Sequence, residues 1–201
     1  MKLYFSPGAC SLSPHIALAE AGLAADYVKV DLKEKKTADG GDYLKIAPKG
    51  QVPFLVLDNG EALTEGPAVV QYIADKAPGA KLAPANGTFE RYRLQEWLNL
   101  ITAELHKSFS PLFNPTLSDD TKAFYRQKIG KTLAYVDGQL AGKDYLMGSQ
   151  FTVADGYLFT ILRWAIGQKF ELPANLKSYF DRVAARPKVR EAMLAEGLIK
   201  A

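Results

Sequence analysis

Residues 52–67 read Val-Pro-Phe-Leu-Val-Leu-Asp-Asn-Gly-Glu-Ala-Leu-Thr-Glu-Gly-Pro, and this stretch carries the clearest local structural signal in the chain. Two β-like runs flank Asn59-Gly60, which predicts a hairpin with a type I′ turn and positive φ at both residues. Pro53 has no N–H to donate to a sheet, so it marks the start of the first strand. The helical pattern after Glu65-Gly66-Pro67 completes a β-β-α unit.

Strand and helix patterns alternate before this unit. They comprise β-like runs at 2–6 and 27–31, a helix that ends at Gly22, and a brief helical segment around Tyr43-Leu44. The first helix is expected to begin at Ser11 or Ser13, because either serine is a good N-cap. The order β-α-β-α-β-β-α predicts a small mixed sheet with helices packed on it, and we assign this α/β domain to residues 1–80.

The second half of the chain is expected to be helical throughout. Residues 78–87 are rich in Pro, Gly and Ala and are typical of a linker. Helical patterns follow at about 88–111, 119–140, 152–167, 176–185 and 188–196. The sequence therefore predicts a fold of the α/β plus all-α class, with an all-helical domain at 87–201.

The composition is that of an ordinary soluble globular protein, with 48% hydrophobic and 23% charged residues among 201. Lys+Arg 25 against Asp+Glu 22 gives a net charge of +3, spread along the chain, so nucleic acid is not an expected partner. No apolar run approaches the roughly 18 residues of a membrane span, so no membrane is expected either. Ser6-Pro7-Gly8 interrupts the region where a signal peptide would be apolar.

The chain has one cysteine, Cys10, and two histidines, His15 and His106. A lone cysteine excludes an internal disulfide and fits a reducing compartment, so we expect a cytoplasmic location. A structural zinc site usually takes four such ligands, so no metal is expected. The chain also lacks a Gly-rich phosphate loop, a dinucleotide fingerprint, G-x-S-x-G and H-E-x-x-H, which excludes the enzyme classes that depend on them.

Cys10 lies between the end of a strand and the start of a helix, where backbone N–H groups and the helix dipole favour a thiolate. The alternative is a small buried hydrophobic side chain, the commonest fate of a free cysteine. Its position favours the reactive interpretation. Because no second cysteine is present, any thiol chemistry requires an external thiol.

Three residues allow both a binding and a structural interpretation. Pro53 opens a strand, and the sequence alone favours an ordinary trans peptide bond there. Glu65 precedes a helix whose first N–H groups favour an anion, while its carboxylate can pair with an amine, but simple capping explains it equally well. Lys35 lies in a charged loop, where a solvated lysine is the simpler expectation.

Asn99, Ala103, His106 and Ser110 follow one another at steps of four, three and four, so they share one stripe of a helix. Such a stripe, with one of only two histidines, can line a cleft or face water. The sequence alone favours a stripe that faces water.

Thr152-Val153-Ala154-Asp155 precedes an apolar helix and matches a capping box with Asp in place of the usual Glu. We interpret Asp155 as a folding device. Its loss should cost about 1 kcal/mol, as for other caps, and leave the chemistry of the site intact.

Taken together, these motifs resemble those of the cytosolic glutathione transferases, specifically the bacterial beta class. The likeness covers nearly the whole chain. The matching segments are residues 2–15, 48–53, 63–68 and 104–113 and the capping box. Each segment alone is a weak signal, whereas the set is highly specific.

The resemblance implies a thioredoxin-like, glutathione-binding domain at 1–80, a helical-bundle domain with the electrophile pocket at 87–201, and a homodimer. It also implies a cis bond before Pro53, against the local expectation. Glutathione is the implied co-substrate, and the residues implied to bind it are Cys10, Lys35, Val52, Pro53, Glu65, Gly66, Asn99, Ala103, His106 and Lys107. The implied electrophile pocket is lined by Phe109, Leu112, Phe113 and Trp164.

By the same resemblance, Cys10 and His106 are the catalytic residues of a glutathione transferase that presents the thiolate of glutathione to a small hydrophobic electrophile. Cys10 also permits thiol–disulfide exchange or peroxide reduction. The alternative is a non-catalytic ligand-binding or protein-interaction module on the same fold. The presence of Cys10, Val52-Pro53, Glu65 and His106 argues against it.

Overall fold

The computed structural model describes residues 1–200, which form two compact units. Unit 1 contains Met1–Leu82 and the residues from Arg186 onward, and unit 2 contains Ala83–Ala185. Their junction lies inside the linker predicted at 78–87. The domain prediction assigned the residues after 185 to the helical domain, whereas the structure groups them with the α/β unit.

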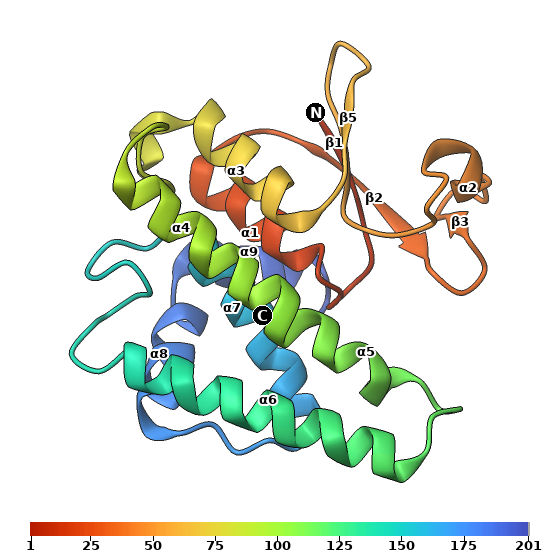
Figure 1. The fold of residues 1–201 in the computed structure, drawn as a ribbon. Coiled ribbons are helices and arrows are strands. Elements are labelled where there is room, and N and C mark those ends of the chain that lie inside the picture. Colours follow the sequence, from red (N-terminus) through yellow and green to blue (C-terminus); the bar gives the residue numbers. More distant parts are fainter. Residues whose placement is uncertain (201) are drawn as a thin grey trace. The chain divides into compact units, whose positions relative to one another are not determined.

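Unit 1 is built on a five-stranded sheet in the order β3-β2-β1-β4-β5, in which β1 and β2 are parallel and the other pairs antiparallel (Figure 1). Its elements are β1 (Lys2–Phe5), α1 (Leu12–Ala21), β2 (Asp26–Asp31), β3 (Lys36–Thr37), α2 (Tyr43–Ile46), β4 (Phe54–Val56), β5 (Ala62–Leu63), α3 (Gly66–Lys76), η1 (Pro78–Ala80) and α9 (Pro187–Ala195). The predicted thioredoxin-like mixed sheet is confirmed. β3 was not predicted, because two polar residues carry no strand pattern.

Alternate residues of β1 pack on opposite faces of the sheet, as strand geometry requires. Phe5 faces α1, where its ring lies 5.9 Å from that of His15. Tyr4 faces α2, where its ring lies 5.6 Å from that of Tyr43. In Figure 1, α1 and α3 lie on one side of the sheet and α2 on the other. Both faces of β1 are therefore buried.

The hairpin between β4 and β5 is confirmed, but its predicted turn type is wrong. Positive φ occurs at Gly60 (86°) and not at Asn59, so the turn is not type I′. Leu57 N–H bonds to Glu61 O at 2.8 Å, which leaves a three-residue loop with glycine in the left-handed position. The Asn59 amide instead binds Glu61, accepting its N–H at 3.1 Å.

The start of α1 also differs from the prediction. Ser11 occupies the N-cap position, but its side chain makes no capping bond. Its hydroxyl oxygen instead accepts the N–H of Ser6 at 3.1 Å and therefore fastens the preceding turn. The helix ends as predicted at Gly22, which has φ 65°.

The C-terminal helix α9 packs against α1, which explains its place in unit 1. Just after it, Glu196 accepts the backbone N–H of Gly8 at 2.8 Å, and its other oxygen lies 3.0 Å from His15 Nδ1. The ring of His15 stacks on Tyr27 at 4.1 Å between centroids. These contacts anchor the loop that precedes Cys10.

Unit 2 is the helical bundle that the sequence predicted. Its elements are α4 (Phe89–Leu100), the π-helix η2 (Ile101–His106), α5 (Lys107–Phe113), α6 (Asp119–Gln139), α7 (Val153–Gly167) and α8 (Ala174–Ala184). Helices α4, η2 and α8 contact α7, and α6 packs on α5, η2 and α8. Since α7 is buried continuously from Val153 to Leu162, it is the core of this unit.

A single helix was predicted over residues 88–111, and the structure replaces it with the consecutive segments α4, η2 and α5. The π-helix widens the turn because its backbone bonds span one residue more than in an α-helix. Hydrophobic spacing gave no sign of it, since Leu98, Leu105 and Phe109 are buried at ordinary helical intervals.

The completely buried carboxyl group of Asp155 lies in the first turn of α7. Its Oδ2 accepts the N–H of Thr152 at 2.7 Å and the hydroxyl of the same residue at 2.9 Å. Its Oδ1 accepts the N–H of Leu146 at 2.9 Å and the hydroxyl of Tyr179 at 3.0 Å. The predicted capping box is present, and its carboxyl group also ties the preceding loop and α8 to α7.

Asp155→Ala is expected to lower the free energy of unfolding by about 3 kcal/mol or more, because several buried donors lose their acceptor. This exceeds the roughly 1 kcal/mol expected of a cap alone. Asp181→Ala is the control, since Asp181 forms only an exposed ion pair on α8 and should cost less than about 0.5 kcal/mol. Urea denaturation followed by circular dichroism measures both. Equal, small losses would contradict the role of Asp155.

Stability should also depend on the protonation of Asp155. Burial raises the pKa of its carboxyl group from 3.8 to about 6, although the hydrogen bonds that it accepts lower it. Between about pH 4 and pH 6 the folded state therefore retains a proton that the unfolded chain releases, so the free energy of unfolding falls as pH rises. At about 1.4 kcal/mol for each pKa unit, the fall is about 3 kcal/mol.

The measurement is urea denaturation of the protein and of Asp155→Asn from pH 4 to pH 8. We expect the stability of the protein relative to the variant to decrease from pH 4 to about pH 6 and to stay constant above pH 7. A relative stability that rises with pH would show instead that the folded carboxyl group has a lowered pKa.

Candidate functional site

Cys10 lies on the connection between β1 and α1, two residues before the helix begins. Its side chain is half-buried and so lies outside the fully enclosed core. The thiol donates a hydrogen bond to the backbone carbonyl of Val52, with 3.2 Å between Sγ and O. A thiol and a backbone segment that are far apart in sequence are thus neighbours in unit 1.

A cis peptide bond and a tyrosine hydroxyl define the backbone conformation around Val52. The peptide bond between Val52 and Pro53 is cis, which confirms what the resemblance implied and corrects the trans bond that the local pattern favoured. The hydroxyl of Tyr43 donates to the carbonyl of Gln51 at 2.8 Å. Burial raises the pKa of Tyr43 above its ordinary value of 10.0, so this phenol remains a neutral donor.

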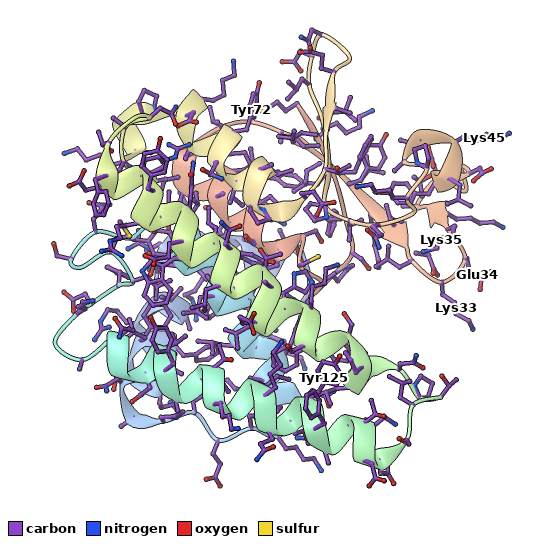
Figure 2. The ribbon with its side chains drawn as sticks, viewed as in Figure 1. Lys33, Glu34, Lys35, Lys45, Tyr72 and Tyr125 are labelled. Atoms are coloured by element: carbon purple, nitrogen blue, oxygen red, sulfur yellow. The ribbon has the colours of Figure 1, made fainter. Side chains whose placement is uncertain are left out.

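Lys35 reaches the same segment, because its Nζ donates to the carbonyl of Gly50 at 2.8 Å. An ammonium group has three N–H donors, so Lys35 can bind a carboxylate at the same time. It is half-buried, whereas Lys33, Glu34 and Lys45 around it are exposed (Figure 2). Lys35 therefore differs from the solvated lysine that the charged loop suggested.

Glu65 immediately precedes α3 and has φ 65°, which is uncommon for a residue other than glycine. Its side chain does not cap the helix, which rules out the capping interpretation. Its carboxylate instead pairs with Lys49 Nζ at 3.0 Å, and both side chains are more than half exposed.

Gly66 begins α3 beside open space, since an added Cβ would meet nothing within 4 Å. The N-terminus of a helix offers backbone N–H groups to an anion. A carboxylate that already pairs with an ammonium group, at Glu65, adjoins it. These are the partners that the two charged groups of an amino acid require.

In unit 2, His106 ends the π-helix and contacts α7. Its Nδ1 lies 2.6 Å from the hydroxyl of Tyr157, and its ring meets Trp164 edge-on at 5.0 Å between centroids. Tyr157 and Trp164 are seven residues apart, so they project from one face of α7. His106 is consequently half-buried and held by two side chains.

The other residues of the predicted stripe, Asn99, Ala103 and Ser110, are exposed, and so is Lys107. The structure therefore places the stripe on the surface of unit 2, with His106 set deeper than its neighbours. This arrangement leaves the stripe available to a ligand.

Trp164 belongs to an aromatic cluster that includes two of the predicted pocket residues. Its ring contacts Phe109 at 6.1 Å and Phe113 at 5.5 Å, in both cases edge to face. Phe113 is 50% exposed and Leu112 is half-buried, whereas Phe109 is 0% exposed. Phe109 supports the cluster from behind, and the accessible members are Leu112, Phe113 and Trp164.

Sequence reasoning missed the two tyrosines that hold these groups. Tyr43 contacts the segment beside Cys10, and Tyr157 contacts His106 from 51 positions away in sequence. No local spacing could have revealed either contact, because each arises from tertiary packing.

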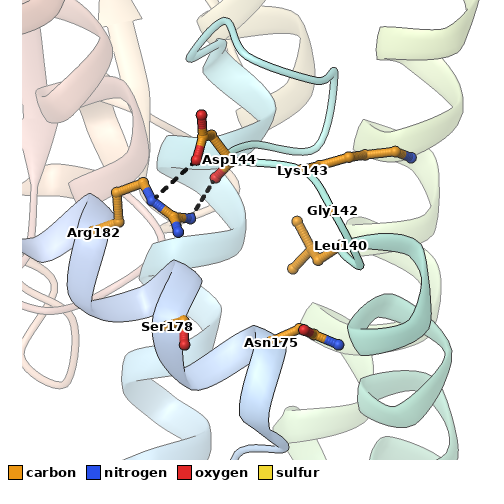
Figure 3. Close-up of a pocket in the computed structure, with 7 residues that line it drawn as sticks. All are labelled: Leu140, Gly142, Lys143, Asp144, Asn175, Ser178 and Arg182. Carbon is orange, nitrogen blue, oxygen red and sulfur yellow. Dashed lines mark hydrogen bonds and ion pairs between the residues drawn. The ribbon is translucent and has the colours of Figure 1, made fainter.

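Elsewhere in unit 2, a polar cavity of about 280 Å³ opens near α8 (Figure 3). It is lined by Leu140, Gly142, Lys143, Asp144, Asn175, Ser178 and Arg182. Arg182 already donates to the carbonyl of Asp144 at 2.8 Å, and none of the predicted site residues lines this cavity. Within residues 1–200, no cluster of His, Cys, Asp and Glu could hold a metal, and no helix could cross a membrane.

Comparison with known families agrees with this geometry. The family model for the glutathione S-transferase N-terminal domain matches residues 1–75, and the model for the C-terminal domain matches residues 100–187. Among curated proteins, the chain is 46% identical over 200 residues to glutathione S-transferase GstA of Escherichia coli O157:H7, covering 98% of this chain and 100% of that protein.

Solved structures give the same result. The ternary complex of BphK, a bacterial glutathione S-transferase, is 57% identical, with a TM-score of 0.96 over 98% of this chain and 100% of that one. A sphingomonad glutathione S-transferase complexed with glutathione is 48% identical, with a TM-score of 0.95 over 99% and 100%. A bacterial beta class enzyme from Sphingomonas chungbukensis is 49% identical, with a TM-score of 0.95 over 99% and 100%.

Proposed function

This chain belongs to the glutathione S-transferase family and is a glutathione transferase, and we propose that its unit 1 binds glutathione through Cys10, Lys35, Val52, Pro53, Glu65 and Gly66. The observation that carries the proposal is the 3.2 Å contact between the Cys10 thiol and the Val52 carbonyl. It combines a nucleophile with a backbone segment to which an extended tripeptide can pair.

The charges of unit 1 complement those of glutathione. At neutral pH glutathione carries one ammonium group and two carboxylates. The Glu65 carboxylate suits the ammonium group of the γ-glutamyl end, and the helix N-terminus at Gly66 suits its carboxylate. Lys35 suits the glycyl carboxylate. Each charged group of the ligand therefore has a partner of opposite charge.

The ion pair between Lys49 and Glu65 supports the same assignment. The ammonium group of Lys49 lies 3.0 Å from the Glu65 carboxylate, so this carboxylate has room for an ammonium partner. Exposed ion pairs contribute little free energy, so the ligand ammonium can replace Lys49 at small cost.

Glu65→Gln is expected to weaken glutathione binding about tenfold, because it removes a charge-assisted hydrogen bond to the ammonium group. Glu61→Gln is the matched control. Glu61 is an exposed glutamate bonded to Asn59 at the hairpin, and its replacement should leave the affinity unchanged. Isothermal titration calorimetry with glutathione measures both. Equal affinities of Glu65→Gln and the unsubstituted protein would rule out this role.

The proposal also includes residues of unit 2. Asn99, Ala103, His106 and Lys107 are proposed to contribute to the glutathione site. Its electrophile pocket is assigned to Leu112, Phe113 and Trp164, with Phe109 behind them. The support is that Asn99, Ala103 and Lys107 are exposed beside the half-buried His106, and that Phe113 and Trp164 form an accessible aromatic surface. An apolar, aromatic surface favours a small hydrophobic electrophile.

Catalysis requires the glutathione thiol to ionise. Hydrogen-bond donors near the sulfur stabilise the thiolate, and its lone pair then forms a bond to the electrophilic carbon while the leaving group departs with the bonding electrons. Cys10 supports a second reaction with a disulfide substrate. Its thiolate attacks one sulfur, the other sulfur leaves as a thiolate, and glutathione resolves the mixed disulfide.

Cys10→Ala separates these two reactions. The substitution should abolish thiol–disulfide exchange, because the attacking sulfur is lost, and change conjugation only a few-fold. Parallel assays with a mixed disulfide and with an aryl halide electrophile measure the two rates. Equal loss of both activities would contradict the division of roles.

Assembly and location are part of the same proposal. We infer a homodimer, supported by the resemblance and by the apolar rings of Phe89 and Tyr92, which are 67% and 61% exposed on α4. We infer a cytoplasmic location from the single free cysteine. A non-catalytic binding module on the same fold is not favoured, because the close relatives are named as enzymes.

A further inference from the structure

We propose that Tyr157 is a positioning residue for His106: its buried hydroxyl donates a hydrogen bond to Nδ1, so that the neutral imidazole carries its hydrogen on Nε2. The inference rests on the proposed role of His106 in glutathione transfer. It concerns the state of the imidazole ring, which can be measured without any assay of activity. All of its atoms belong to unit 2.

The contact is short, and its phenol partner is buried. The hydroxyl oxygen of Tyr157 lies 2.6 Å from His106 Nδ1, and Tyr157 is 2% exposed. A buried phenol hydroxyl is costly to leave unpaired, so this bond is retained whenever the unit is folded. The edge-on contact with Trp164 limits rotation of the ring from a second direction.

The direction of the bond follows from Thr102, one turn before His106. The Thr102 hydroxyl donates to the carbonyl of Leu98 at 2.7 Å, which uses its single hydrogen. Towards Tyr157 it can therefore only accept, and at 3.4 Å it lies beyond the usual range of an O–H···O bond. Thr102 is thus a poor acceptor for the Tyr157 hydroxyl, whereas His106 Nδ1 lies only 2.6 Å from it, so the phenol hydrogen is assigned to the bond with the imidazole.

The tautomer decides what His106 can do. An imidazole that accepts at Nδ1 carries hydrogen on Nε2 and is a donor there. In this state Nε2 cannot take the proton of a thiol, but it can stabilise a thiolate by a hydrogen bond. Tyr157 thereby assigns His106 the role of hydrogen-bond donor to the glutathione sulfur, and the thiol proton passes to solvent.

The test is nitrogen NMR of the ¹⁵N-labelled protein at pH 8, through the two-bond couplings of the imidazole rings. The chain has only two histidines, so the spectrum of His106→Gln assigns both. In the unsubstituted protein we expect the shift of an unprotonated nitrogen at Nδ1 and of a protonated nitrogen at Nε2. In Tyr157→Phe we expect both His106 shifts to move towards those of a mixture of tautomers.

Two results would overturn the inference. One is a protonated Nδ1 in the unsubstituted protein, and the other is identical His106 shifts in Tyr157→Phe. Tyr135→Phe is the matched control, because Tyr135 is 53% exposed on α6. The His106 signals of this variant should equal those of the unsubstituted protein. Unmoved His15 signals in Tyr157→Phe show that unit 1 is intact.

Activity is the separate, second readout. Tyr157→Phe should lower kcat/KM for glutathione conjugation about fivefold, as for the loss of one ordinary hydrogen bond, while Tyr135→Phe keeps full activity. If the spectra are as expected but His106→Gln conjugates at the normal rate, the positioning by Tyr157 stands and the proposed role of His106 fails. The two ideas are thus distinguished by experiment.

Discussion

The carboxyl group of Asp155 accepts four hydrogen bonds inside unit 2, and the position of α7 depends on them. Those bonds join α7 to the loop before it and to α8. Two residues further along the same helix, Tyr157 contacts His106, and Trp164, two turns after Tyr157, contacts it as well. The helix that carries both contacts of His106 is therefore fixed at its start by one completely buried carboxyl group.

Unit 1 contains a comparable arrangement built from different elements. The hydroxyl of Tyr43, on the short helix α2, fixes the carbonyl of Gln51, and the next residue carries the carbonyl that meets the Cys10 thiol. In both units, a buried tyrosine holds a group that is proposed to act on glutathione. Each tyrosine supplies a neutral donor on a rigid ring, which fixes direction at little entropic cost.

Local sequence patterns predicted the elements of this fold well, because strand alternation and helical periodicity record burial directly. They failed where tertiary contacts override local preference. Ser11 turns back to Ser6 instead of capping, and Asn59 binds Glu61 instead of adopting positive φ. The cis bond before Pro53 followed from the resemblance and not from the local pattern. The contact between Tyr157 and His106 left no trace in sequence spacing at all.

Because α9 belongs to unit 1, this unit is completed only when the last residues of the chain have been synthesised. The ribosome synthesises the sheet of unit 1 first, then the whole of unit 2, and the residues after 185 last. Glu196, which binds the backbone of Gly8 and the ring of His15, is therefore missing when the loop before Cys10 first emerges. The contacts that hold the loop before Cys10 can therefore form only near the end of translation, after the helical unit has been synthesised.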